Sequence, residues 1–105
     1  MGEPVIVEAV RTPIGKRGGW LSGIIAPKLL SIVQQEVLNR SNIPPDAVDQ
    51  LVGGCVTQAG QQASNVTRNA WLSADTGYTP AATTVDCQCG SVSYTHLTLP
   101  TILLV

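Results

Sequence analysis

Three short runs of apolar and β-branched residues alternate with two longer segments of helical periodicity, and this order constrains the fold more than any other feature. The runs are residues 4–10, 48–56 and 81–87. Because β-branched side chains favour strands, each run predicts a buried strand. A β-α-β-α-β order needs crossover connections, which produce a parallel sheet with helices on its faces. The sequence therefore predicts an α/β fold with a mostly parallel sheet.

The first helical segment covers residues 26–40. Its apolar stripe consists of Ala26, Leu29, Leu30, Val33 and Val37. Pro27 suits a first helical turn, and Arg40 suits the negative end of the helix dipole. The stripe predicts a helix that lies on the sheet by one face.

The second helical segment covers residues 61–75 and ends before a break at residues 78–80. Its apolar positions are Ala63, Val66, Ala70, Trp71 and Ala74. Residues 11–19, in contrast, are rich in glycine and proline, which predicts an irregular loop between the first strand and the first helix.

Composition excludes several classes of function. The chain has 105 residues, 44% of them hydrophobic, which suits one small domain with a core. Six Lys and Arg against seven Asp and Glu give a formal net charge of -1, so we expect no nucleic-acid and no membrane partner. The N-terminus lacks the pattern of a signal peptide, and no apolar run approaches the ~20 residues of a membrane span. The expected location is the cytoplasm.

The three cysteines are Cys55, Cys87 and Cys89. An odd number in a chain this short indicates reduced thiols rather than a disulfide framework. A cysteine becomes a good nucleophile when its pKa is lowered, and a helix N-terminus lowers it. Ligands of parallel sheets bind beyond the carboxyl ends of the strands, and Cys89 follows the third predicted strand. We therefore expect Cys89 to be a nucleophile, and Cys87 and Cys55 to be packing residues.

Two other patterns in the sequence resemble a metal site and a modification site, but neither is expected to function as one. The cysteines and His96 form a conceivable zinc set, but Cys87-x-Cys89 lacks the longer spacing of structural zinc sites, so no metal is expected. The segment Asn65-Val66-Thr67 matches a glycosylation sequon, which has no role in a cytoplasmic protein.

Three segments, taken in order, resemble the N-terminal part of a thiolase, an acetyl-CoA acyltransferase. They are VIVEAVRTPIGK, GGCVTQAGQQASNVTR and, at residues 83–91, TTVDCQCGS. The segments VDCQCGS and GKRGGWLSG are also similar to actinobacterial thiolases of lipid and sterol degradation. The family has a nucleophilic cysteine at the start of a buried helix, and Cys89, Gly90 and Ser91 match that motif. The resemblance implies that an acyl-CoA acylates Cys89, that the Cys89 N–H holds the oxyanion, and that Gly90 and Ser91 position the cysteine.

The resemblance also implies a substrate and an assembly. A thiolase cleaves 3-ketoacyl-CoA with coenzyme A, or condenses acetyl-CoA, so coenzyme A is a substrate and no cofactor is expected. Thiolases are dimers or tetramers, which leaves Arg68 and Asn69 as either interface residues or an exposed polar face. Lys16 and Arg17 either contact coenzyme A phosphates or are simply solvated.

The resemblance ends at Ser91. We interpret residues 1–91 as a partial, truncated thiolase N-terminal domain and residues 92–105 as a non-family tail, produced by a frameshift or another artefact. A thiolase also needs a histidine and a second cysteine from its C-terminal half, and the position of His96 in the tail argues against that role. This chain alone is therefore expected to be inactive. The alternative function is that of a non-catalytic remnant that associates with thiolase subunits.

Overall fold

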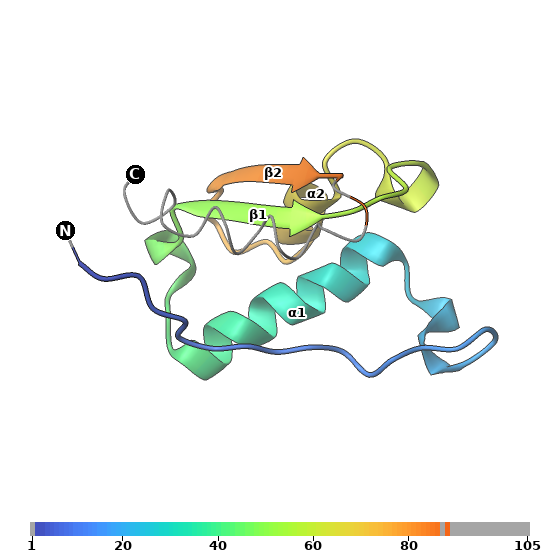
Figure 1. Cartoon of the computed structure of the whole chain (residues 1–105), viewed down its shortest axis with the longest axis horizontal. Helices are drawn as coiled ribbons and strands as arrows, with labels where there is room; N and C mark the ends of the chain where they lie inside the picture. Colours follow the sequence, from blue (N-terminus) through green and yellow to red (C-terminus); the bar gives the residue numbers. More distant parts are fainter. Residues whose placement is uncertain (1, 87, 89–105) are drawn as a thin grey trace.

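The computed structural model describes residues 2–86 and residue 88 (Figure 1). Its helices are α1, Ala26–Ser41, and α2, Val66–Ser73. Its strands are β1, Gln50–Gly54, and β2, Ala81–Val85. Short 3-10 helices occur at Trp20–Gly23, Pro45–Ala47 and Gly60–Gln62.

The sheet of the described chain consists of β1 and β2, which pair in parallel. The register runs from Gln50 opposite Ala81 to Gly54 opposite Val85. Helix α2 forms the crossover between the strands and packs against both of them, behind the sheet in Figure 1. The predicted α/β class and the parallel pairing of the second and third strands are confirmed. Both strands are shorter than the predicted runs, and Cys87 lies outside the described residues.

Gly53 lets α2 approach β1 closely. A Cβ atom built at Gly53 would collide with Thr67 Oγ1 of α2 and would lie 3.2 Å from Thr67 Cβ. Thr67 itself is buried. The glycine at this position therefore sets the distance between the helix and the sheet.

Helix α2 is shorter at its start than the periodicity predicts. Asn65 is its N-cap, and the Asn65 side chain accepts a hydrogen bond from the Arg68 N–H at 3.2 Å. Ser64, just before the cap, has a φ of 61°, which no helix residue adopts. Residues 61 and 62 thus belong to the short 3-10 helix, residues 63–65 form a turn that leads into α2, and the apolar Ala63 belongs to that turn.

Helix α1 packs against α2, so the prediction that it lies on the sheet is wrong. Its buried residues are Ser31, Gln34 and Leu38, whereas the predicted apolar stripe is only half-buried. The physical reason is the width of the sheet. Two strands lie ~4.8 Å apart, so one helix of ~10 Å diameter already covers the face. No room remains for α1 on that face of the sheet, and the helix uses its neighbouring face against α2.

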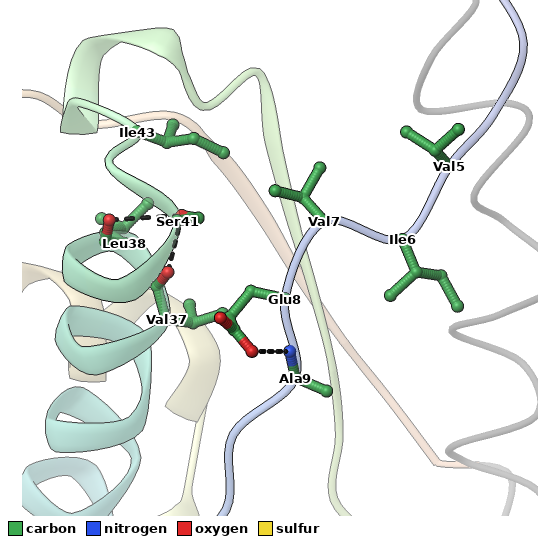
Figure 2. A pocket seen from close by; sticks show the side chains of 9 residues that line it. All are labelled: Val5, Ile6, Val7, Glu8, Ala9, Val37, Leu38, Ser41 and Ile43. Atoms are coloured by element: carbon green, nitrogen blue, oxygen red, sulfur yellow. Dashed lines mark hydrogen bonds between the residues drawn. The ribbon is translucent and has the colours of Figure 1, made fainter.

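The first predicted strand is also wrong, because residues 4–10 are irregular. Val5, Ile6 and Val7 are 67%, 75% and 62% exposed. Figure 2 shows that this segment runs beside the C-terminal end of α1, where it lines a shallow apolar hollow with Val37 and Ile43. A strand needs a ladder partner for its N–H and C=O groups, and this segment lies along a helix instead of a sheet edge. The loop predicted at residues 11–19 is confirmed.

The core of the described chain centres on α2, which contacts α1 and both strands. Its buried apolar residues are Leu38, Val66, Ala70 and Trp71. The Trp71 Nε1–H donates a 2.6 Å hydrogen bond to the Tyr78 carbonyl oxygen, so the indole also fixes the turn that leads into β2. In the described part of the chain, no helix is long and apolar enough to span a membrane.

Candidate functional site

The carboxyl ends of β1 and β2 meet at one edge of the sheet. Cys55 follows β1, and its N–H donates to the Val85 carbonyl oxygen at 2.9 Å, which extends the ladder beyond the last strand residue. Asp86 follows β2 and is exposed. Open parallel sheets bind ligands beyond this edge, so its residues form the candidate site.

Asp86 shapes the chain where it leaves β2. Its Oδ1 accepts a hydrogen bond from the Gln88 N–H at 3.1 Å, and Gln88 has a φ of 51°. An aspartate that bonds the N–H two residues on forms an Asx turn. This turn gives Asp86 a structural role that the sequence alone does not assign.

The predicted site residues Cys89, Gly90 and Ser91 lie outside the described residues. Their roles as nucleophile and positioning residues therefore stay predictions. The structure does place β2, which ends four residues before Cys89 in the sequence, beside β1 at the carboxyl edge. His96 is likewise outside the described chain.

Cys55 is half-buried and is not part of the core, so its interpretation as a core packing residue is wrong. Gln62 Nε2 donates to its Sγ at 3.3 Å, and the thiol donates to the Thr57 carbonyl oxygen at 3.5 Å. Gln62 Nε2 also donates to Thr57 O at 2.6 Å. Cys55 therefore helps to hold the loop between β1 and α2 against the end of the strand.

A polar cluster of Asn65, Thr67 and Thr84 joins the start of α2 to β2. Asn65 Nδ2 donates to the Ala82 carbonyl oxygen at 2.8 Å. The Thr84 hydroxyl lies 2.7 Å from Asn65 Oδ1 and 2.7 Å from Thr67 Oγ1, and it accepts from the Thr67 N–H at 3.2 Å. We call these three residues the Asn65 cluster.

The sequence contains one indication of the Asn65 cluster, the preference of asparagine for helix N-caps. The apolar stripe does not reveal it, because the stripe begins earlier, at Ala63. Asparagine is a favoured N-cap, so an Asn directly before an apolar helical stripe marks a helix start. Nothing in the sequence indicates that the same amide also bonds β2, because that contact depends on the crossover. In the sequence, Thr84 is a β-branched residue in a predicted strand. Its hydrogen bonds to Asn65 and Thr67 follow only from the position of α2.

The remaining candidates are exposed. Lys16 and Arg17 lie in the loop at residues 11–19, and Arg68 and Asn69 lie on the outer side of α2. Their exposure fits both solvated side chains and binding residues, so the two interpretations of each pair stay open. Within residues 2–86 and 88, no group of three His, Cys, Asp or Glu side chains is arranged to hold a metal ion.

Comparison with known families identifies the chain. The family described as "Thiolase, N-terminal domain" matches residues 4–97. The chain belongs to the thiolase family. The match includes β1, α2, β2 and the predicted Cys89-Gly90-Ser91 motif. The division of the chain at residues 91 and 92 stays a prediction.

Among similar thiolases, a steroid 3-ketoacyl-CoA thiolase, FadA6, of Mycobacterium tuberculosis is 44% identical over 91 residues. A β-ketoadipyl-CoA thiolase of Escherichia coli is 39% identical over 92 residues. A 3-ketoacyl-CoA thiolase of Pseudoalteromonas atlantica is 36% identical over 93 residues. Each alignment covers 87% of this chain and, in the same order, 22%, 23% and 24% of the relative. The chain therefore spans about a quarter of the length of these thiolases, and the predicted similarity to an actinobacterial sterol thiolase is confirmed.

Proposed function

We propose that this thiolase chain supplies the nucleophile of an acyl-CoA acyltransferase. Cys89 Sγ attacks the thioester carbonyl of an acyl-CoA, the carbon–sulfur bond to coenzyme A breaks, and the cysteine proton ends on the coenzyme A thiol. The product is an acyl-thioester on Cys89. The observation that supports this proposal is the placement of β2 beside β1, because the thiolase motif at residues 83–91 begins within β2, whose carboxyl end lies at the candidate site.

The substrate class follows from the similar thiolases. FadA6 is named a steroid 3-ketoacyl-CoA thiolase, and the Pseudoalteromonas relative is named a 3-ketoacyl-CoA thiolase. We infer that the acyl donor of the whole reaction is a 3-ketoacyl-CoA in the cleavage direction, or acetyl-CoA in the condensation direction. A bulky substrate such as a steroid acyl-CoA is favoured by the higher identity to FadA6.

Complete turnover needs more than the nucleophile. The family resemblance implies a histidine base and a second cysteine from the part of a thiolase beyond this stretch, and groups of this kind act as a unit. Without that base we expect Cys89 of the 105-residue chain to be acylated only slowly and stoichiometrically, and the chain by itself not to catalyse thiolysis of acetoacetyl-CoA. Full activity would arise in a thiolase polypeptide that carries the remaining groups, in a dimeric or tetrameric assembly.

Acylation is tested by mass spectrometry. The purified chain is incubated with acetyl-CoA, and peptide mapping follows the acetyl group on each cysteine. We expect one acetyl adduct, on Cys89, which disappears in Cys89→Ser and persists in the matched variants Cys87→Ser and Cys55→Ser. Absence of the adduct from the wild-type chain, or its persistence in Cys89→Ser, would contradict the proposal.

A second candidate function is supported by exposed apolar side chains. Ile14 is 93% exposed and Trp20 is 100% exposed, which is unusual for large apolar residues. A non-catalytic chain that associates with thiolase subunits would cover them. Size-exclusion chromatography with a full-length 3-ketoacyl-CoA thiolase tests this function: co-elution of the wild-type chain, lost in Trp20→Ser, together with no acetyl adduct on Cys89, would favour association over acylation.

A further inference from the structure

The Asn65 cluster does more than cap a helix. As an N-cap, Asn65 needs only its Oδ1 atom, which accepts from the Arg68 N–H. Its other amide atom, Nδ2, donates to Ala82 O of β2, and its Oδ1 also meets the Thr84 hydroxyl. The Asn65 side chain therefore bonds both the start of α2 and two residues of β2, Ala82 and Thr84. Strand β2 is the strand that precedes the predicted nucleophile.

The number of protons available in the cluster fixes which group donates and which accepts in each hydrogen bond. Asn65 Oδ1 can only accept, so it takes the single proton of the Thr84 hydroxyl. The Thr67 hydroxyl, 2.7 Å away, then has to donate to Thr84 Oγ1. Thr84 Oγ1 also accepts the Thr67 N–H, so every lone pair and proton that the hydroxyl offers has a partner. A fully satisfied, partly buried network of this kind fixes one geometry better than apolar contacts do.

The Asn65 cluster lies close, along the sequence, to the carboxyl end of β2 and to the predicted nucleophile. Thr84 is the last strand residue but one in β2, and its neighbour Val85 receives the Cys55 N–H at the carboxyl edge. Asp86 then forms the turn that ends at Gln88, and Cys89 is the next residue in the sequence. The cluster is thus a helix-to-strand attachment that lies shortly before the predicted nucleophile in the sequence.

We propose that Asn65 and Thr84 are positioning residues for the acylation of Cys89. They hold the carboxyl end of β2 at a fixed place relative to α2, and the segment that begins there carries the thiol. The inference depends on the proposed function, since it takes Cys89 as the nucleophile. Acyl transfer is sensitive to such placement, because a shift of ~1 Å in a reacting group lowers the rate by about a hundredfold.

Two matched pairs of variants separate positioning from simple stability. Thr84→Val keeps the shape of the side chain and removes the hydroxyl, whereas Thr84→Ser keeps the hydroxyl. Asn65→Asp keeps the helix cap but replaces the donor to Ala82 O with a second acceptor, whereas Asn65→Ala removes both functions. If the cluster only caps α2, Asn65→Asp would behave like the wild type.

The readout is the rate of Cys89 acetylation by acetyl-CoA, measured by peptide mapping of the full 105-residue chain. Iodoacetamide alkylation of Cys55 in a parallel sample serves as an internal reference, because Cys55 lies on the neighbouring strand end and reports general loosening. We expect Thr84→Val and Asn65→Asp to lower the Cys89 rate by about tenfold or more, with Cys55 alkylation unchanged and with Thr84→Ser near the wild-type rate.

The possible outcomes are distinct. Wild-type Cys89 acetylation in Thr84→Val would overturn the inference, and so would a loss at Cys89 that is accompanied by an equal gain in Cys55 alkylation. If the wild-type chain itself is not acetylated, the proposed function fails, and the inference is then judged by iodoacetamide at Cys89. In that case a changed ratio of Cys89 to Cys55 alkylation in Thr84→Val supports positioning, and an unchanged ratio rejects it.

Discussion

Replacing Gly53 with alanine tests the closest contact between the sheet and α2. The new Cβ would collide with Thr67 Oγ1 and would lie 3.1 Å from Thr67 Cγ2, while Thr67 is buried and cannot swing into solvent. Overpacking of this kind costs about 1–3 kcal/mol. Displacing the Thr67 hydroxyl also breaks its bond with Thr84, which adds about 1 kcal/mol, and alanine recovers about 0.5–1 kcal/mol of backbone entropy. We expect Gly53→Ala to lower the free energy of unfolding by about 2 kcal/mol.

Urea unfolding followed by tryptophan fluorescence measures this effect. Trp71 is 2% exposed and Trp20 is 100% exposed, so the emission change on unfolding reports the core around Trp71. With a urea dependence of about 1 kcal/mol/M for a chain this small, the midpoint shifts down by about 2 M. Gly23→Ala is the matched control, because nothing lies within 4 Å of a Cβ built at Gly23, and its effect should stay within about 0.5 kcal/mol.

A double mutant shows whether Thr67 is the cause. Thr67→Ala alone loses the hydroxyl bond to Thr84, but in Gly53→Ala/Thr67→Ala the new methyl group occupies the space that Thr67 leaves. The two effects should therefore differ from simple addition by about 1 kcal/mol or more. Strict additivity, or a Gly53→Ala variant as stable as Gly23→Ala, would refute the close approach of α2 and β1.

Three further predictions concern stability and use the same urea assay. Trp71→Phe should lower the free energy of unfolding by about 1–3 kcal/mol, because it leaves the Tyr78 carbonyl oxygen without the indole donor, whereas Trp20→Phe, at an exposed site, should have little effect. Asn42 ends α1 with a φ of 56°, so Asn42→Ala should destabilise the chain by about 1 kcal/mol while Asn42→Gly should be tolerated; equal effects would contradict the left-handed cap. Glu36→Gln removes the 2.7 Å ion pair with Arg40, whose side chains are about half exposed, so the loss should not exceed about 0.5 kcal/mol, and a larger loss in low salt would show that this pair is stronger than its exposure indicates.

The sequence predicts well those parts of the fold in which a segment packs against the segments next to it along the chain. The run at residues 81–87 pairs with the run at residues 48–56 through one crossover, and α2 covers both strands. The start of α2 was predicted poorly, because an apolar Ala63 extended the helical stripe into a loop. The residue that decides the boundary is Asn65, whose side chain accepts a hydrogen bond from the Arg68 N–H, and a periodic pattern contains no information on capping.

The candidate site was predicted from a different kind of information. A motif and its place after a strand predict Cys89, Gly90 and Ser91 as site residues, and these three residues lie outside the described part of the chain. No motif in the sequence indicates Asn65 and Thr84, although their side chains attach β2 to α2. Their hydrogen bonds join residues 17 and 19 positions apart, and such contacts appear only when the crossover is built.

The error in the first strand and the error in the position of α1 have one cause. A β-branched run is suited to a strand only when a sheet edge lies beside it, and an apolar helix stripe is suited to a sheet only when the sheet is wide enough. Residues 4–10 lie along α1 in the described structure, so they add no strand. In the described structure the sheet then stays two strands wide, α2 covers one of its faces, and α1 turns its Ser31 and Gln34 face to α2. A third strand from residues 4–10 would widen the sheet by ~4.8 Å and would offer the half-buried stripe of Leu30, Val33 and Val37 an apolar surface. The prediction that α1 packs on the sheet therefore depends on the prediction of a strand at residues 4–10. Because these residues form no strand in the described structure, the α1 stripe does not pack on the sheet.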